Sequence, residues 1–166
     1  MTAGVNPQEL VVDHLSQLGV DHDIVPCDPA LADTAAFCAA YGYSPDDSAN
    51  TIIVVGKGER LVPVACVVLA TTRLDVNGVV RRRLGVRKAS FASAEETMQL
   101  TGMEIGGVTA FALPDGLPIW IDAAVMARPR VILGGGSRSI KVITPPSTLS
   151  MLDNASVVDD LARARE

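Results

Sequence analysis

Two glycine-rich segments carry the residue types and spacing that can bind or transform a ligand. The first, residues 102–109 (GMEIGGVT), contains adjacent glycines, and the second, residues 134–139 (GGGSRS), combines three glycines with two hydroxyls and a guanidinium. Because glycine has no Cβ, its backbone N–H groups can approach a carbonyl or phosphate closely. Taken alone, each segment is compatible with a tight turn or with a loop that binds an anion or an acyl ester.

A third candidate is Asp122, which follows the apolar run 118–121 (PIWI). A carboxylate at the end of a strand lies where loops assemble binding sites, so Asp122 is a candidate substrate-binding residue. An aspartate before a short helix is equally compatible with an N-cap.

Several catalytic motifs are absent from the sequence. It contains no GxxxxGK[ST], no GxGxxG opening a helix, no GxSxG and no HExxH, which argues against nucleotide hydrolysis, dinucleotide binding, serine hydrolysis and zinc hydrolysis. The three cysteines form no CxxC pair, and the two histidines, His14 and His22, lie in the acidic first third. We therefore expect no metal and no cofactor. Hydrolysis would then depend on positioning and on backbone donors around a developing oxyanion.

The charges are distributed unevenly along the chain. Its 166 residues have a net charge of -5 and only 4% aromatic residues, which argues against a general DNA-binding protein. Residues 1–47 contain eight carboxylates and no Lys or Arg, whereas residues 57–88 carry a net charge of +6. This asymmetry suggests that a polyanion is held on one side. An ordinary solvated helix face around residues 81–83 explains the basic run equally well.

The chain has no N-terminal secretion pattern and no apolar run of the ~20 residues that a membrane span needs. We therefore expect a cytoplasmic protein without a membrane partner. The length favours one domain over residues 1–166, because two domains would each fall near the lower limit for a stable core.

The elements that must position these candidates follow from hydrophobic periodicity and turn residues. Expected helices cover residues 8–18, 30–41 and 75–84, and a fourth runs to about residue 100 from a capping box at Ser93 and Glu96. A short helix through residue 127 and a final helical turn after residue 145 are also expected. Expected strands cover residues 23–26, 51–55, 61–69, 88–91, 108–113, 118–121, 130–133 and 140–143. Residues 51–55 and 61–69 should pair as a hairpin, and the absence of a strict βαβ rhythm favours an α+β fold.

Four segments together resemble the YbaK/prolyl-tRNA synthetase-associated domain family. They are 49–54 (ANTIIV), 100–111 (LTGMEIGGVTAF), 117–122 (LPIWID) and 131–139 (VILGGGSRS), and the likeness covers roughly residues 8–150. The resemblance implies an α+β fold with a mixed sheet curled into a partly open barrel surrounded by helices. It also implies trans-editing, the hydrolysis of a mischarged aminoacyl-tRNA with a small amino acid. Such editing is needed because binding energy alone discriminates poorly between small side chains.

The resemblance also assigns site residues. Gly106 and Gly107 would offer backbone donors near the scissile carbonyl, and Asn50 would join them as the third catalytic residue. The substrate-binding residues would be Thr51, Thr109, Asp122, Gly134, Gly135, Gly136 and Ser137. The candidate tRNA-binding residues are Arg73, Arg81, Arg82, Arg83, Arg87, Lys88 and Arg138. The partner implied is the acceptor end of an aminoacyl-tRNA, and an aminoacyl-tRNA synthetase is a second candidate partner.

Two positions depart from the family pattern. Well-studied members carry a lysine that contacts the acceptor end where this chain has Asn50, which cannot neutralise a phosphate. The family's Gly-Gly-x-x-Pro loop ends here in Ala110 instead of proline. These departures keep open a non-catalytic homologue that binds tRNA or an aminoacyl adduct without turnover. The triple-glycine loop alone leaves a small-molecule anion-binding protein as a third reading.

Overall fold

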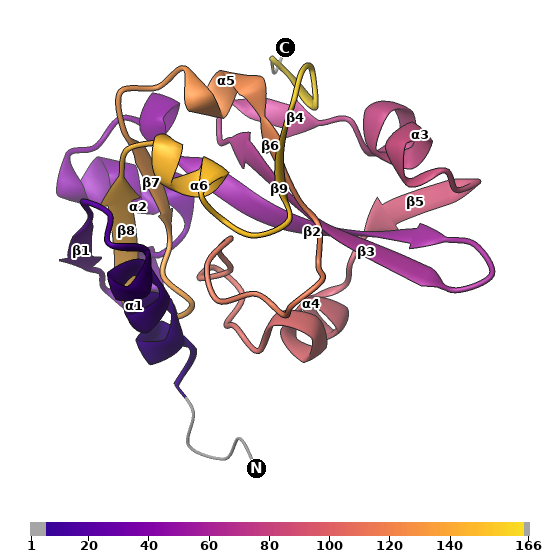
Figure 1. Ribbon diagram of the computed structural model, residues 1–166. Helices are drawn as coiled ribbons and strands as arrows, with labels where there is room; N and C mark the ends of the chain where they lie inside the picture. The colour runs from indigo at the N-terminus through magenta and orange to yellow at the C-terminus, as the bar shows by residue number, and fades with distance from the viewer. Residues whose placement is uncertain (1–5, 165–166) are drawn as a thin grey trace.

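Helices and strands alternate irregularly along the chain in the computed structural model, which describes residues 6–164 (Figure 1). The α-helices are α1 (Pro7–Leu18), α2 (Thr34–Tyr41), α3 (Arg81–Leu84), α4 (Ala94–Thr101), α5 (Ala123–Met126) and α6 (Ser147–Ser150). Short helical turns are η1 (Pro29–Leu31), η2 (Pro45–Asp47) and the π-helical η3 (Val76–Val80). The strands are β1 (Asp23–Pro26), β2 (Ala49–Lys57), β3 (Leu61–Leu69), β4 (Thr72–Leu74), β5 (Lys88–Phe91), β6 (Ile119–Asp122), β7 (Val131–Gly134), β8 (Ile140–Thr144), β9 (Ala155–Val158) and β10 (Ala162–Ala164).

The largest sheet has the strand order β5-β2-β3-β6-β9. The β2–β3 and β2–β5 pairs are antiparallel, whereas β3–β6 and β6–β9 are parallel. This mixed sheet confirms the expected α+β class and the 51–69 hairpin. Two smaller sheets, β1-β8-β7 and β10-β4, complete the described residues, among which no closed barrel forms. A parallel bridge between Ser48 and Ile132 brings the start of β2 beside β7.

Both faces of the large sheet are covered, which explains why β3 reads as a continuous apolar run. Ala65 and Val67 point into one buried cluster together with α1, β7 and β8, while Val64 and Cys66 point into a second cluster with Trp120. Side chains alternate across a strand, so a strand buried on both faces must be apolar at every position. This two-sided burial makes β2 and β3 the rigid centre from which the other segments are positioned.

Several local expectations are confirmed. Ser93 Oγ accepts from the Glu96 N–H at 3.0 Å, and the Glu96 carboxylate accepts from the Ser93 N–H at 2.9 Å, so α4 begins with the capping box. Helix α1 ends at Gly19, whose φ of +66° suits glycine.

The expected helix 30–41 is divided into η1 and α2, because Asp28 and Asp33 each stand at the N-cap of a separate helical turn.

The expected strand at residues 108–113 is wrong. This apolar segment is buried, at Thr109, Ala110 and Phe111, yet it forms turns and no ladder. Ala112 has a φ of +56°, which is incompatible with a strand, and its N–H donates to His14 Nδ1 at 2.8 Å. Burial here is achieved by a folded loop against α1 instead of by strand pairing.

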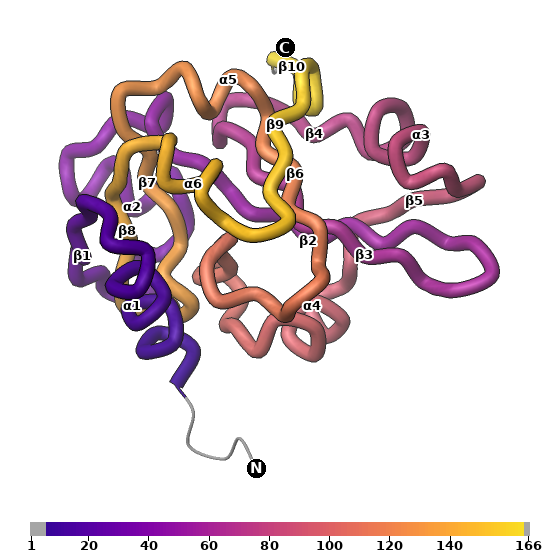
Figure 2. The backbone as a smooth tube through the Cα atoms, in the orientation of Figure 1, coloured from indigo at the N-terminus to yellow at the C-terminus, as the bar shows by residue number. Residues whose placement is uncertain are grey.

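Three short strands escaped the sequence analysis: β4, β9 and β10. Their side chains are largely exposed at residues 156, 157, 163 and 164, so hydrophobic alternation does not mark them. They exist because the chain returns to distant partners, β9 to β6 and β10 to β4. Figure 2 shows this last segment running along β6 and ending beside β4.

Candidate active site

The two glycine-rich segments pack directly against each other, backbone to backbone. The Gly136 N–H donates to the Gly107 carbonyl at 2.7 Å, and the Glu104 N–H donates to the Gly136 carbonyl at 3.2 Å. A Cβ built on Gly107 would collide with the Ser137 carbonyl, and one on Gly134 would lie 2.5 Å from the Val108 carbonyl oxygen. The glycines are therefore required for the close approach of the two loops, whatever ligand they bind.

The turn at residues 104–107 presents one glycine to the surrounding space. Gly106 has a φ of +91°, a backbone region that favours glycine, and the Gly107 N–H is already bonded to the Glu104 carbonyl at 2.9 Å. The Gly107 amide is therefore occupied within the turn. The Gly106 N–H, by contrast, has no acceptor among residues 6–164 and remains available to solvent or a ligand.

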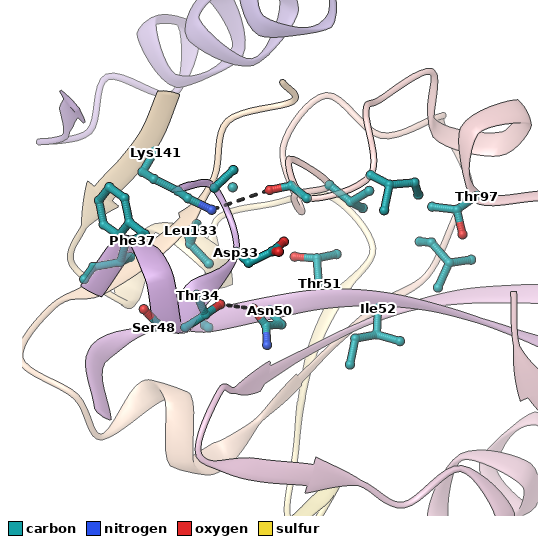
Figure 3. A pocket seen from close by; sticks show the side chains of 18 of the residues that line it. Asp33, Thr34, Phe37, Ser48, Asn50, Thr51, Ile52, Thr97, Leu133 and Lys141 are labelled. Carbon is teal, nitrogen blue, oxygen red and sulfur yellow. Dashed lines mark hydrogen bonds between the residues drawn. The ribbon is translucent and has the colours of Figure 1, made fainter. Parts of the chain in front are cut away.

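A half-open cavity of about 380 Å³ lies between these loops, β2 and α2 (Figure 3). Of the residues singled out from the sequence, four line it: Asn50, Thr51, Gly106 and Gly134. Its other lining residues are Ala32, Asp33, Thr34, Phe37, Ser48, Ala49, Ile52, Ile53, Ala92, Thr97, Ile105, Val108, Ile132, Leu133 and Lys141. We refer to this cavity as the acyl pocket, after the ligand that the resemblance described above implies.

Two polar residues of β2, Asn50 and Thr51, line the acyl pocket and differ in their hydrogen bonding. Asn50 Oδ1 accepts from the Thr34 hydroxyl at 3.2 Å, which ties β2 to the start of α2. Thr51 Oγ1 is buried and has no hydrogen-bond partner in the described part of the chain. A buried hydroxyl without a partner is uncommon, so Thr51 is free to bond to a ligand in this pocket.

The remaining predicted substrate-binding residues lie outside the pocket lining. Gly135 and Gly136 are buried where the loops approach β8 and α1, and Ser137 Oγ donates to Gln8 Oε1 at 2.6 Å. Thr109 is fully buried and its hydroxyl has no partner among residues 6–164. These residues support the loop packing from behind the pocket.

Asp122 is also remote from the acyl pocket. Its side chain is 3% exposed, and its Oδ1 accepts from the Leu161 N–H at 3.2 Å. Burial raises the pKa of this carboxyl, while the bonds from backbone N–H groups act in the opposite direction. Asp122 precedes α5 but makes no side-chain capping bond there, so its contacts hold the C-terminal segment against β6.

Lys141 is the pocket residue that the sequence analysis missed. It stands on β8, is 8% exposed, and its Nζ donates to the Gly106 carbonyl at 3.5 Å, as Figure 3 shows. Its ammonium also lies 5.6 Å from the centroid of the Phe37 ring. Burial lowers the pKa of Lys141 below its ordinary value. One signal was visible in the sequence, namely a single lysine inside the otherwise uncharged run 140–144 (IKVIT).

Arg138 ties together three segments at the rim of the pocket. Its Nε donates to the Pro29 carbonyl at 2.9 Å and its Nη1 to the Ile105 carbonyl at 3.1 Å. Nη1 also lies 3.6 Å from the Asp33 carboxylate. The guanidinium thus connects η1, the turn at residues 104–107 and the triple-glycine loop.

The chain can now be compared with known proteins. A family model described as an aminoacyl-tRNA editing domain matches residues 28–150, which include both glycine loops and every residue that lines the acyl pocket. The chain belongs to the aminoacyl-tRNA editing domain family.

Individual relatives of this editing domain are distant in sequence. An uncharacterized protein of Bacillus subtilis (strain 168), YwhH, is 25% identical over 150 residues, which span 90% of this chain and 93% of the relative. The crystal structure of a hypothetical protein, APE2540, is 26% identical with a TM-score of 0.80, and covers 90% of this chain and 97% of its own. A protein described as a proposed trans-editing enzyme for prolyl-tRNA synthetase has the same fold, with a TM-score of 0.81, 24% identity, and coverage of 96% and 98%.

Six of the 14 basic residues of this editing domain lie around two hollows that adjoin at Asn77. Lys57, Arg81, Arg87 and Lys88 line one hollow, and Arg73 and Arg163 line the other. We call these six side chains the basic surface. Arg163 joins Arg73 because the two residues are paired partners of β10 and β4, which the sequence analysis did not foresee.

Arg82 and Arg83 differ from their neighbours. Both are exposed, but the Arg83 guanidinium lies 5.0 Å from the centroid of the Trp120 ring and is thus held against the sheet.

Within residues 6–164, no group of three or more His, Cys, Asp or Glu side chains is placed to hold a metal ion. In the same residues, no helix has the length and apolar character needed to cross a bilayer.

Replacing Gly107 with alanine should separate the glycine loops. The new Cβ meets the backbone of Ser137, which cannot rotate away, so we expect Gly107→Ala to lower the free energy of unfolding by about 1–3 kcal/mol. Urea denaturation measures this difference. Gly58→Ala is the matched control, because its nearest neighbour would be 3.8 Å away. Equal stability of the two variants would show that the loops tolerate separation.

Replacing Lys141 with methionine should stabilise the fold at neutral pH. A folded-state pKa below the ordinary lysine value of 10.5 means that the protonated form is disfavoured by folding. The cost is therefore present at pH 7 and vanishes as the pH rises toward 10.5. We expect Lys141→Met to raise Tm at pH 7 by about 2–4 °C, which is the shift that about 1 kcal/mol of added unfolding free energy produces in a domain of this length. At alkaline pH the variant and the wild type should have the same Tm. The exposed control Lys57→Met should leave Tm unchanged at both pH values, and a lower Tm for Lys141→Met would contradict the reasoning.

Proposed function

We propose that this protein is a trans-acting deacylase, which hydrolyses the ester of a mischarged aminoacyl-tRNA that carries a small amino acid. Membership of the editing-domain family supports a role in editing. The observation that carries the finer proposal is the acyl pocket, in which a buried ammonium, an unpartnered hydroxyl and a free glycine amide converge on one cavity. The similarity in fold to a proposed trans-editing enzyme for prolyl-tRNA synthetase agrees with action in trans.

The proposed reaction uses water as the nucleophile. Neither His14 nor His22 lines the acyl pocket, so its serine and threonine hydroxyls have no imidazole base beside them. Water would form a bond to the ester carbonyl carbon, and the bond from that carbon to the ribose oxygen would break. The ribose oxygen receives the proton that the water releases, which yields the free amino acid and the uncharged tRNA. The Gly106 N–H is a donor for the carbonyl oxygen as it gains charge.

The walls of the pocket support the proposed selection for a small amino acid. Phe37, Ile132 and Leu133 are nearly or fully buried, so their positions are set by core packing. In the proposal this cavity of about 380 Å³ holds the acyl group together with part of the terminal nucleoside. The space left beside the nucleoside then admits only a small side chain, which is how an editing site avoids destroying correctly charged tRNA.

The basic surface is proposed to bind the tRNA backbone. Strand β2 connects the two regions, since Thr51 lines the acyl pocket and Lys57 lines a basic hollow. Six residues of strand span roughly 20 Å, a separation that a flexible acceptor end can cover. Arg73, Arg81, Arg87 and Lys88 belong to this surface, Arg82 lies beside it, and Arg138 lies at the pocket rim. An aminoacyl-tRNA synthetase is the partner that would supply the substrate, and the cytoplasm is where both occur.

A second candidate function is binding without turnover. Asn50 is uncharged and its amide oxygen is occupied by Thr34, and Ala110 is buried in the core instead of lining the pocket wall. Both observations favour a homologue that retains the pocket and holds an aminoacylated end without hydrolysing it.

A panel of misacylated tRNAs decides between the two functions. We expect the protein to deacylate at least one tRNA carrying a small amino acid at ten or more times its spontaneous rate, measured by loss of radiolabelled aminoacyl-tRNA. Binding of such a tRNA without faster loss would establish the non-catalytic reading. In that case Asn50→Lys should be assayed next, because activity gained by this substitution would locate the missing group.

The basic surface can be tested through salt dependence. Each phosphate contact contributes about 0.7–0.9 to the slope of log Kd against log salt concentration, so Arg81→Ala, Arg87→Ala and Lys88→Ala combined should reduce this slope by about two to three. Filter binding at several salt concentrations measures it. The control is Arg130→Gln. The Arg130 guanidinium lies 5.4 Å from the centroid of the Tyr43 ring, and Arg130 lines neither hollow. If both variants keep the wild-type slope, the basic surface is only a solvated face.

A further inference from the structure

Lys141 presents an uncompensated positive charge in the wall of a cavity. Among residues 6–164, no carboxylate lies within 4.0 Å of its Nζ, and its only hydrogen bond is the 3.5 Å contact to the Gly106 carbonyl. Buried charges are normally paired, because removing an ammonium from water without a partner costs several kcal/mol. A group that is retained at such a cost indicates a partner that arrives with the ligand.

The acidic groups near Lys141 do not serve as its counter-ion. The Asp33 side chain is 79% exposed and lies closest to Arg138, at 3.6 Å. Cys27 is buried next to β8, and burial raises the pKa of its thiol, so it remains neutral at physiological pH. The positive charge on Lys141 is therefore available to a bound molecule.

The head group of Lys141 is held in place although it is not neutralised. The Gly106 carbonyl and the Phe37 ring, with its centroid 5.6 Å from Nζ, contact the ammonium from two elements. Two of its three N–H donors have no partner in the described residues. The Gly106 amide also has none, and both residues line the same cavity (Figure 3). Three N–H donors without acceptors among the described residues thus belong to two residues that line the cavity, and Thr51, whose buried Oγ1 has no partner there either, lines it as well.

Lys141 is the only cationic side chain that lines the acyl pocket within the described part of the chain. Asn50 and Thr51 offer dipoles, and Asp33 offers the opposite charge. Among the described lining residues, Lys141 is therefore the one that can stabilise a developing negative charge with a full positive charge. A fixed cation that is itself largely removed from water, as Lys141 is at 8% exposure, acts more strongly on such a charge than it would in bulk solvent.

We propose that Lys141 is a catalytic residue of the deacylation, whose ammonium donates a hydrogen bond to the ester carbonyl oxygen as water attacks. This inference rests on the proposed function. As the bond between water oxygen and carbonyl carbon forms, an electron pair moves onto the carbonyl oxygen, next to Lys141 Nζ and the Gly106 N–H. The pair returns when the bond to the ribose oxygen breaks, and that oxygen takes the proton released by water. Lys141 keeps its three protons throughout.

Lys141→Met and Lys141→Arg test this role, with Arg130→Gln as the control, because Arg130 lines neither the acyl pocket nor the basic surface. Single-turnover deacylation measures the chemical step on the misacylated tRNA that the wild type hydrolyses fastest. Binding is measured separately with a stable analogue, in which the aminoacyl group is joined to the terminal ribose through an amide. We expect Lys141→Met to slow the chemical step about 10²–10³-fold while the Kd for the analogue changes less than about threefold. Lys141→Arg keeps the charge and should retain more activity than Lys141→Met, and Arg130→Gln should match the wild type.

The outcomes separate this inference from the proposed function. If the wild type deacylates a tRNA and Lys141→Met does so within about threefold, Lys141 is not catalytic and the proposed function stands. If Lys141→Met loses binding as much as rate, or melts at a lower temperature than the wild type, the lysine is a binding or structural residue and the inference fails. If the wild type deacylates no tRNA of the panel, the proposed function fails and the catalytic role fails with it.

Discussion

The close contact between two glycine-bearing loops is the constraint on which the site depends. The Gly136 N–H reaches the Gly107 carbonyl at 2.7 Å, and no side chain larger than hydrogen fits at Gly107 or Gly134 without displacing backbone. This contact places the turn that contains Gly106 over the end of β7, where it forms one wall of the acyl pocket. The glycines thus act mainly by allowing two backbones to meet, and Gly106, which lines the acyl pocket, keeps an N–H without an acceptor among residues 6–164.

The acyl pocket combines groups that each reduce stability. Among residues 6–164, the buried cation of Lys141 has no carboxylate within 4.0 Å, and the buried hydroxyl of Thr51 has no hydrogen-bond partner. Isolated groups of this kind are usually removed or paired in a structural core, so two of them in one cavity point to a site kept for its chemistry. The surrounding two-sided core of β2 and β3 supplies the stability that offsets them.

The charge distribution of the molecule also becomes intelligible in three dimensions. The net charge of -5 is a sum over an acidic first segment and a basic middle. In the fold, the basic residues of α3 and β5 gather at the far end of β2 from the acyl pocket, and β10 adds Arg163 beside Arg73. One extended strand therefore connects the acyl pocket to the basic surface, the two regions proposed to hold the acyl group and the tRNA backbone.

The sequence by itself determined the α+β class, the β2–β3 hairpin, the capping box of α4 and the importance of the glycine pair, since these depend on local pattern and turn chemistry. It did not determine the fate of residues 108–113, because burial in a loop and burial in a strand produce the same apolar run, and only contact with His14 distinguishes them. It also could not identify Lys141 as a pocket residue. That position depends on β8 lying between β1 and β7 and on the Gly106 turn approaching from 35 residues away. Tertiary structure alone decided which charged groups lose their water, because burial is set by distant segments and not by neighbours in the chain.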